Sequence, residues 1–276
     1  MPAIKKITKF RYQQGNFEKA NDCVIVEQPL QVVISTENTQ AKPIVYTITY
    51  RTPGEDRNLI TGLLLSEGVI TTPNEIVKLA VDDDEENHNR WHVQVSDDTF
   101  NALELSQKYQ PTYSSCGLCG STSIQQFESK HEINLSKKES WLVAIKVNLY
   151  AEKMKQQQLL FAQTGGNHAA SLFDEHGKLV SLHEDIGRHN ALDKLLGYVA
   201  INCREKNLRE SVIVLSSRIS LEMVQKTLVA GIPVLVAVGG ASSLAIDAAN
   251  RFGLTLIGFV SDKGFNVYAG HQRLIT

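Results

Sequence analysis

The second half of the chain alternates short apolar runs with amphipathic segments that end at glycine, and this alternation constrains the fold more than any other feature. The predicted strands are Val212–Leu215, Ile232–Val238 and Leu254–Val260, and the helices between them are Ile219–Ala230 and Ser242–Phe252. Near-continuous apolar strands that alternate with helices are typical of a parallel sheet covered on both faces. We therefore expect a three-layer α/β domain.

Upstream of this domain the pattern is mixed. A helix is predicted through Leu59, Ile60, Leu63 and Leu64 with its end near Gly68, and the acidic run Val81–Arg90 is expected to be a solvated loop. Short β-branched or alternating segments predict strands at Cys23–Glu27, Leu30–Ser35, Ile44–Tyr50 and Trp91–Ser96. Later in the chain we expect a helix at Asn148–Gln157, a hairpin around Asp174–Lys178, and a helix carrying Leu192, Leu195, Leu196 and Val199.

These patterns suggest three parts. We assign residues 1–112 to a smaller α+β portion, residues 113–120 to a mobile loop that carries two cysteines, and residues 121–276 to the C-terminal α/β domain. The length of 276 residues is ample for such an arrangement, because ordinary domains contain about 100 to 200 residues.

Composition excludes several classes of protein. The chain has 28 Lys+Arg against 30 Asp+Glu, so a net charge of -2 argues against nucleic-acid binding driven by bulk charge. Four cysteines cannot form the disulfide framework of a small secreted protein. Neither a signal peptide nor an apolar run of about 18 residues is present, so we expect a cytoplasmic protein with no membrane partner.

The sheet predicts a place for a ligand before any motif is interpreted. In open parallel sheets, ligands bind beyond the carboxyl ends of the strands. Three segments fall there: Ser216–Arg218, Gly239–Ser243 and Ser261–Gly264. The first two lead into helix N-termini, which favour anions, and their glycine pair and arginine suit a phosphate. The alternative is that all three are ordinary turns, since Gly and Ser are common in turns.

The pair Cys116 and Cys119 is the most unusual local feature, set among Ser, Thr and Gly. Four interpretations compete: a thioredoxin-like redox centre, a zinc site, a structural pair, and a relay in which a thiolate accepts persulfide sulfur and passes it on. The zinc deaminase motif does not fit, because Ser115 replaces its proline. Cys23 and Cys203 stand alone and receive no role.

Residues 183–189 read HEDIGRH and place five ionisable residues within seven positions. The segment either binds an anion through Arg188 and the histidine after it, or holds acid–base groups. The alternative is a structural network in which Glu184 and Asp185 cap the following helix and pair with Arg188. A second polar loop, Thr164–His168, also contains a histidine, although a lone histidine is more often structural.

Several of these strings together resemble the FdhD family. The strings are SCGLCG at 115–120, HEDIGRHNALDKLLG at 183–197, SSRISLEMVQK at 216–226, GIPVLVAVGGASSLAIDAA at 231–249, LTLIGFVSDKGFNVY at 254–268 and LLLSEGVI at 63–70. The resemblance runs from about residue 24 to the C-terminus, and it is the combination of strings that makes it specific.

The resemblance implies a sulfurtransferase that is an accessory protein of formate dehydrogenase. Such a protein takes persulfide sulfur from a cysteine desulfurase and passes it to the molybdenum or tungsten bis-molybdopterin guanine dinucleotide cofactor of formate dehydrogenase, which is bound only as the sulfur acceptor. It also implies a homodimer and a C-terminal domain similar in fold to cytidine deaminases. Cys116 matches the persulfide-carrying cysteine and Cys119 its partner.

Two groups of residues are the candidates for binding the cofactor. The resemblance supplies the first group, which is Phe259, Val260, Ser261, Asp262, Lys263 and Gly264. Position at the sheet edge supplies the second group, which is Ser217, Arg218, Gly239, Gly240 and Ser242. The alternative function is a cofactor-docking chaperone whose thiols are incidental or bind zinc.

Overall fold

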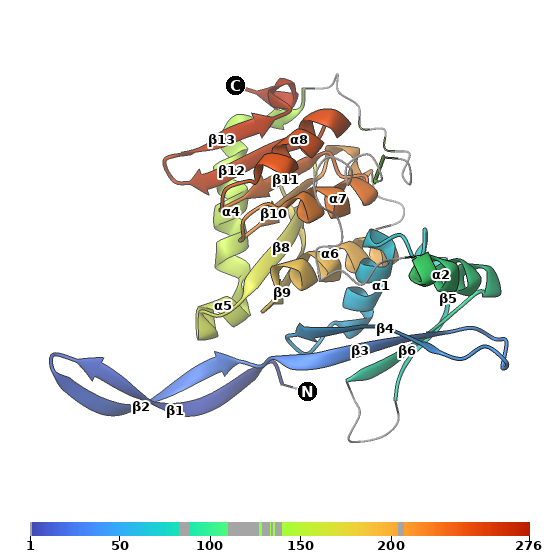
Figure 1. Cartoon of the computed structure of the whole chain (residues 1–276). Helices are drawn as coiled ribbons and strands as arrows, with labels where there is room; N and C mark the ends of the chain where they lie inside the picture. Colours follow the sequence, from blue (N-terminus) through green and yellow to red (C-terminus); the bar gives the residue numbers. More distant parts are fainter. Residues whose placement is uncertain are drawn as a thin grey trace.

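The structure, a computed structural model, describes residues 2–82, 89–109, 127–128, 133, 135, 140–203 and 207–276. The predicted cysteine loop at 113–120 lies outside the described residues, so the three-part division of the chain stays a prediction. The body of the protein is built on a four-stranded sheet from the first half of the chain and a six-stranded sheet from the second half (Figure 1).

A long two-stranded ribbon precedes both sheets and extends away from the body (Figure 1). It consists of β1 (Ile4–Gln13) and β2 (Asn16–Ile25), joined by a tight turn in which Gln14 and Gly15 have positive φ. The predicted strand at Cys23–Glu27 is therefore wrong in its bounds. The ribbon escapes a search for periodicity because side chains on both faces of its outer half are exposed.

The first sheet has the strand order β4-β3-β6-β5, and only the β3–β6 pair is parallel. Two helices pack on one of its faces, where the buried core includes Leu30, Ile34, Leu59 and Phe100. The elements are β3 (Gln28–Ser35), β4 (Ile44–Arg51), α1 (Asp56–Ser66), a 3-10 turn (Pro73–Glu75), β5 (Ile76–Val81), β6 (Arg90–Val95) and α2 (Asp97–Tyr109). Three predicted strands and the first predicted helix are confirmed.

The second sheet has the order β13-β12-β11-β10-β8-β9. Its strands are β8 (His168–Phe173), β9 (Leu179–Asp185), β10 (Val212–Leu215), β11 (Val234–Ala237), β12 (Thr255–Ser261) and β13 (Gly264–Ala269). The parallel sheet expected from the sequence is correct only for β10, β11 and β12. Strand β8 pairs antiparallel with β10, and tight hairpins place β9 antiparallel to β8 and β13 antiparallel to β12. The hairpin predicted around Asp174–Lys178 is confirmed.

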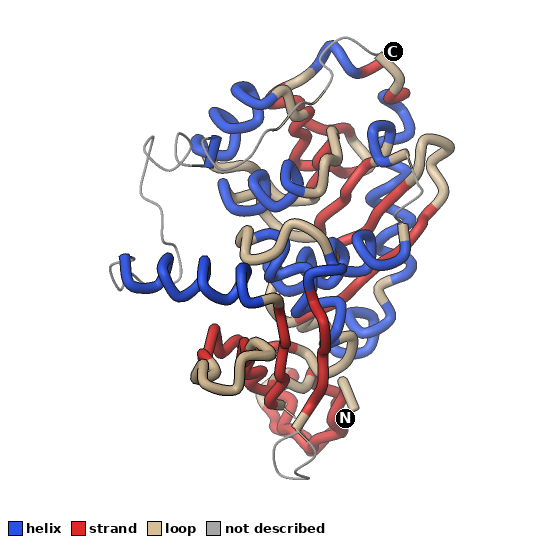
Figure 2. Tube along the Cα trace, turned by 90° about the vertical axis from the view of Figure 1, so that its right-hand side faces the viewer, coloured by secondary structure: helices blue, strands red, loops and turns tan. Residues whose placement is uncertain are grey.

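Helices cover both faces of this sheet, as Figure 2 shows. Along β10, Val212 and Val214 point into the core beneath one helix, whereas Ile213 and Leu215 point into the core beneath three others. The first helix is α4 (Ala144–Gln157); the other three are α6 (Arg188–Asn202), α7 (Leu221–Val229) and α8 (Ser243–Phe252). The sheet and the helices on its two faces form the three layers that the sequence predicted. The likeness of this domain to cytidine deaminases stays a prediction.

The remaining described elements are short. They are β7 (Leu142–Val143), α5 (Leu159–Thr164), 3-10 turns at Leu208–Glu210 and His271–Arg273, and β14 (Leu274–Ile275), which pairs with β7. Helix α1 of the first half packs against α6 of the second half, so the two sheets are joined through a helix pair. No helix within the described parts of the chain is long and apolar enough to cross a membrane.

Candidate functional site

The carboxyl ends of the three parallel strands meet at one edge of the sheet, and backbone hydrogen bonds join the loops that follow them. The N–H of Gly239 donates to the carbonyl oxygen of Ser217 (3.1 Å), and the N–H of Ile219 donates to that of Gly240 (2.9 Å). The N–H of Phe259 donates to the carbonyl oxygen of Gly239 (3.1 Å). The structure thus brings together the first two segments that the sequence placed at this edge, and it joins them to β12 at Phe259, two residues before the third segment, Ser261–Gly264, begins.

The two glycines of the middle loop are required by packing within the protein. A Cβ atom at Gly239 would lie 2.9 Å from the backbone of Arg218, and one at Gly240 would lie 2.7 Å from the ring of Phe259. The sequence suggested that these glycines let the backbone approach a phosphate. Packing against the Arg218 backbone and the Phe259 ring therefore accounts for both glycines, and the approach of a phosphate to their backbone stays a prediction.

Phe259 combines an unfavourable backbone conformation with an exposed ring. Its φ is 54°, in the left-handed region that costs a non-glycine residue about 1 kcal/mol or more, and 56% of its surface is exposed. Strained residues cluster at functional sites, where surrounding structure holds them. An exposed aromatic ring at the end of β12 can stack with the flat face of a base.

The rest of the stretch 259–264 is divided between the core and an exposed turn. Val260 is buried in the core beneath α4. Ser261, Asp262 and Lys263 are exposed in the β12–β13 turn, where the Ser261 hydroxyl accepts from the backbone N–H of Lys263 and donates to the carbonyl oxygen of Gly264. The Ser261 hydroxyl is therefore used within the turn, whereas the side chains of Asp262 and Lys263 are exposed.

The second group of candidates shows a similar division. Ser242 caps α8, because its hydroxyl accepts from the N–H of Ala245 (3.3 Å). Ser217 is buried and its hydroxyl donates to the carbonyl oxygen of Arg218. Arg218 is exposed, so its guanidinium is accessible to a ligand.

Two further segments reach the same edge, which the sequence did not reveal. Strand β8 runs antiparallel to β10, so its start lies beside the end of β10: the N–H of Ser216 donates to the carbonyl oxygen of Ala169 (3.0 Å). His168 at that start pairs in register with Asp185 at the end of β9. The polar loop before β8 and the HEDIGRH segment therefore both border the edge formed by the three loops.

The carboxylates of HEDIGRH join parts of the protein together. Glu184 accepts two hydrogen bonds from the backbone N–H groups that begin α5, at Leu160 and Phe161 (both 2.8 Å). Asp185 is fully buried and lies 2.8 Å from the ammonium of Lys194. The expected pairing of these carboxylates with Arg188 is wrong, because each is held by another partner.

Asp185 and its partner also tie the two halves of the chain. The Asp185 carboxylate accepts from the N–H of Thr52 (3.1 Å), and the Lys194 ammonium donates to the carbonyl oxygen of Thr52 (3.0 Å). Nearby, the buried His183 lies 2.7 Å from the carboxylate of Glu55. Burial raises the pKa of Glu55, but the hydrogen bond with His183 and the positive charges of His183 and Lys194 together outweigh burial and hold the pKa below its usual value.

Unlike these buried carboxylates, the two histidines at the edge have pKa values that favour their neutral form. Burial lowers the pKa of His168, and the nearby guanidinium groups of Arg188 and Arg218 lower it further. His189 lies 3.5 Å from the carboxylate of Glu222, and its pKa is also lowered, chiefly by burial. The neutral form of both histidines is therefore favoured.

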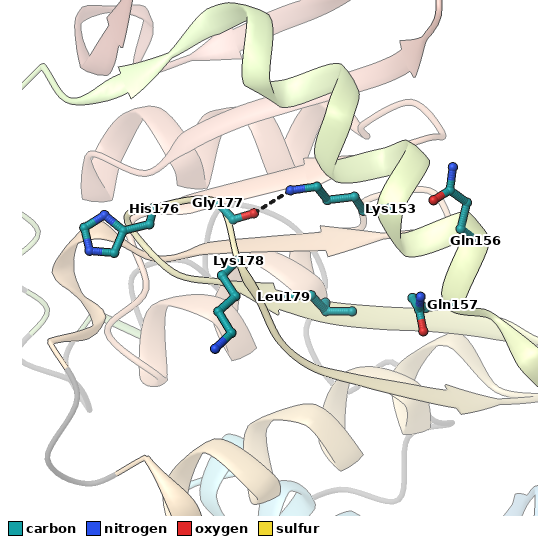
Figure 3. A pocket seen from close by; sticks show the side chains of 7 residues that line it. All are labelled: Lys153, Gln156, Gln157, His176, Gly177, Lys178 and Leu179. Carbon is teal, nitrogen blue, oxygen red and sulfur yellow. Dashed lines mark hydrogen bonds between the residues drawn. The ribbon is translucent and has the colours of Figure 1, made fainter.

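A separate pocket of about 430 Å³ lies at the opposite edge of the sheet, between α4 and the β8–β9 turn (Figure 3). Its lining includes Lys153, Lys178 and His176, and Lys153 donates to the carbonyl oxygen of Gly177 (2.9 Å). The strand-end loops do not contribute to it, so it is distinct from the candidate site. Cys116 and Cys119 lie outside the described residues, whereas Cys203 is buried and Cys23 is half-buried.

The fold and this edge define the class of protein as α/β with a candidate anion-binding edge at the carboxyl ends of its parallel strands. Within that class, the chain belongs to the FdhD/NarQ family, whose model matches residues 25–275. The match begins at the last residue of β2, so nearly the whole ribbon lies before it.

Relatives and a solved structure agree with this family. The sulfur carrier protein FdhD of Corynebacterium efficiens is 38% identical over 275 residues, which covers 90% of each chain. That of Picrophilus torridus is 38% identical over 278 residues and covers 100% of each chain. A crystal structure of a protein from Desulfotalea psychrophila, described as a formate dehydrogenase accessory protein, has a similar fold, with a TM-score of 0.75 at 22% identity over 99% of this chain and 100% of that one.

Proposed function

We propose that this protein carries sulfur from a cysteine desulfurase to the molybdenum or tungsten bis-molybdopterin guanine dinucleotide cofactor of formate dehydrogenase. The observation that supports this most strongly is the family match over residues 25–275, together with relatives that are named sulfur carrier proteins. The proposed site of action is the cytoplasm, and the proposed working form is a homodimer.

In this proposal Cys116 is the sulfur-carrying residue. Its thiolate attacks the outer sulfur of the persulfide on the desulfurase; the donor's S–S bond breaks and the donor cysteine leaves as a thiolate. Cys116 is then a persulfide, and no electrons are gained or lost overall. Cys119 is the second thiol, three residues away, where it can lower the pKa of the first or resolve its adducts.

The edge of the six-stranded sheet is the proposed docking place for the cofactor, which is the substrate that receives sulfur. A guanine dinucleotide carries a flat base and a diphosphate. The exposed ring of Phe259 offers a surface for the base, and Arg218 and the helix N-termini offer positive charge for the phosphates. The donor set at this edge therefore fits the group.

The test is activation of sulfur-free formate dehydrogenase by the purified protein with a cysteine desulfurase and cysteine. We expect Cys116→Ala to abolish activation and Cys23→Ser to leave it unchanged, because Cys23 belongs to the ribbon outside the family match. Full activation by the Cys116→Ala variant would show instead that the protein docks the cofactor without carrying sulfur.

A further inference from the structure

The buried His183 stands between a serine and a carboxylate. Its Nε2 lies 2.7 Å from the Oγ of Ser181, two residues earlier on the same face of β9, and its Nδ1 lies 2.7 Å from a carboxylate oxygen of Glu55. The ring packs against Tyr198 of α6, with the two ring centroids 5.2 Å apart. A serine and a carboxylate on the two nitrogens of one imidazole are the arrangement of a nucleophile, its base and the group that orients the base.

The carboxylate of this group comes from the first half of the chain, directly before α1. Burial acts against ionisation of Glu55, but its hydrogen bond with His183 and the nearby ammonium of Lys194 hold its pKa below the usual value, so it is ionised. The bond to His183 is short but bent, because the Nδ1–H does not point at the carboxylate oxygen. Catalytic hydrogen bonds are often poorly aligned in the free protein and tighten when substrate binds.

Two backbone irregularities aim these side chains. Glu55 has a φ of 59°, in the left-handed region that is unfavourable for a residue with a Cβ atom. On β9, Ser181 and Leu179 pair with consecutive residues of β8, which leaves Val180 as an extra residue between them. This bulge lies directly before Ser181. Strained residues and bulges are both common beside active sites, where they orient functional side chains.

The strand that carries Ser181 is open on one side. Within the described part of the chain, β9 is the end strand of its sheet, so alternate backbone N–H groups along it face away from β8. Backbone N–H groups of this kind can bond to the oxyanion that forms when a hydroxyl attacks a carbonyl carbon. Ser181 itself is half-buried, so we expect only short acyl groups to reach its hydroxyl.

We propose that Ser181, His183 and Glu55 form a triad that hydrolyses esters of short carboxylic acids, an activity separate from the proposed sulfur transfer. The Ser181 hydroxyl attacks the carbonyl carbon, and its proton passes to Nε2 of His183 while Glu55 stabilises the imidazolium. The ester C–O bond breaks, and the alcohol leaves with that proton. Water then attacks the acyl-serine in the same way and releases the carboxylic acid, so nothing is oxidised or reduced overall.

Other contacts hold the two halves of the chain together without this group. The Asp185 carboxylate accepts from the N–H of Thr52, and the Lys194 ammonium donates to the carbonyl oxygen of Thr52. The backbones of α1 and α6 also touch where they cross. We therefore expect variants of the triad to keep the fold, so that a loss of activity reports on the chemistry.

The test uses the full chain with its thiols alkylated beforehand, because a thiolate is also a nucleophile. We expect wild type to gain one fluorophosphonate probe, located on Ser181 by peptide mapping, and to hydrolyse p-nitrophenyl acetate. Ser181→Ala should lose both reactions, and His183→Gln should slow both about 100-fold or more, the usual contribution of a general base. Ser140→Ala, at an exposed serine before β7, is the control and should match wild type.

Glu55→Gln separates a catalytic role from a structural one. It keeps the size of the side chain and removes its charge, so we expect slower hydrolysis with little change in the thermal unfolding midpoint; Glu55→Asp should restore part of the rate. No probe on Ser181 in wild type, or equal hydrolysis by wild type and Ser181→Ala, would overturn the triad. Sulfur loading of Cys116 should be the same in wild type and Ser181→Ala, and its loss in that variant would contradict a separate activity.

Discussion

Gly62 of α1 and Gly197 of α6 face each other where the two helices cross. A Cβ atom at Gly62 would lie 1.9 Å from the carbonyl oxygen of Asp193, and one at Gly197 would lie 1.9 Å from that of Asn58. The helix backbones are therefore in direct contact at this crossing. This contact sets the position of the first half of the chain against the sheet that carries the candidate site.

Substitution at this crossing should disrupt the junction between the two sheets. We expect Gly62→Ala or Gly197→Ala to lower the free energy of unfolding by about 3 kcal/mol, because the added methyl group overlaps backbone atoms that cannot turn aside. Urea unfolding followed by circular dichroism measures this. Gly166→Ala is the control, since the nearest atom to its methyl group would be a side-chain atom of Ile25 at 3.3 Å and the nearest backbone atom would lie 4.0 Å away; an equal loss there would contradict the explanation.

The buried pair of Asp193 and Lys226 lies beside this crossing, at 2.8 Å. Asp193→Asn removes the carboxylate that pairs with the buried Lys226 ammonium at 2.8 Å and leaves it only Glu222 at 3.7 Å, so we expect a loss of about 3 to 5 kcal/mol of stability. Asp262→Asn, at an exposed carboxylate in the β12–β13 turn, should change stability little. Comparable effects of the two substitutions in thermal unfolding would show that the buried pair has no special role.

His168 should make stability depend on pH. Its folded pKa lies below the ordinary value of 6.5, owing to burial and then to Arg188 and Arg218, with Asp185 opposing. The folded protein therefore binds this proton less tightly than the unfolded chain does. The contribution of His168 to stability is complete above the unfolded pKa and declines as the pH falls through it.

The measurement is unfolding free energy from pH 8 to 5 for wild type and His168→Gln. We expect a smaller decline in the variant. Pyrophosphate bound at the proposed docking edge of the six-stranded sheet should also raise the pKa of His168, which an NMR titration of the imidazole would detect. An unchanged titration curve at saturating pyrophosphate would place the anion elsewhere.

Phe259 provides a prediction about the base. Phe259→Ala removes an exposed ring at the end of β12, so we expect weaker binding of guanosine by about 1 to 3 kcal/mol, the usual contribution of stacking on an aromatic side chain. Val267→Ala on the neighbouring β13, another partly exposed apolar residue, is the control. Equal affinities of wild type and Phe259→Ala for guanosine would show that the base binds away from this ring.

The sequence predicts the centre of the fold better than its margins. The parallel strands Val212–Leu215 and Val234–Ala237 are buried on both faces, so each is apolar throughout and easily recognised. The ribbon strands, with mostly exposed residues, and the short β13, half exposed, lack such a pattern. In the sequence, Gly62 and Gly197 resemble helix breakers. Their role is to let two helix backbones touch, and it becomes visible only where two helices that are far apart in the chain cross.

The site shows the same division. The three loops that follow parallel strands are predictable, since parallel strands end at one edge. His168 and Arg188 join that edge only because β8 lies antiparallel beside β10 and β9 lies antiparallel beside β8, which depends on the strand order. The partners of Glu184 and Asp185 come from α5, α6 and the segment before α1, so their roles follow from packing that residue spacing does not encode.

The most direct test of the sulfur-carrier account is the mass of the intact protein after incubation with a cysteine desulfurase and cysteine. We predict one added sulfur atom in wild type, located on Cys116 by peptide mapping, and still present in Cys23→Ser. Cys116→Ala should gain none. Sulfur added equally to Cys116→Ala and wild type, or to neither, would contradict the claim that Cys116 carries it.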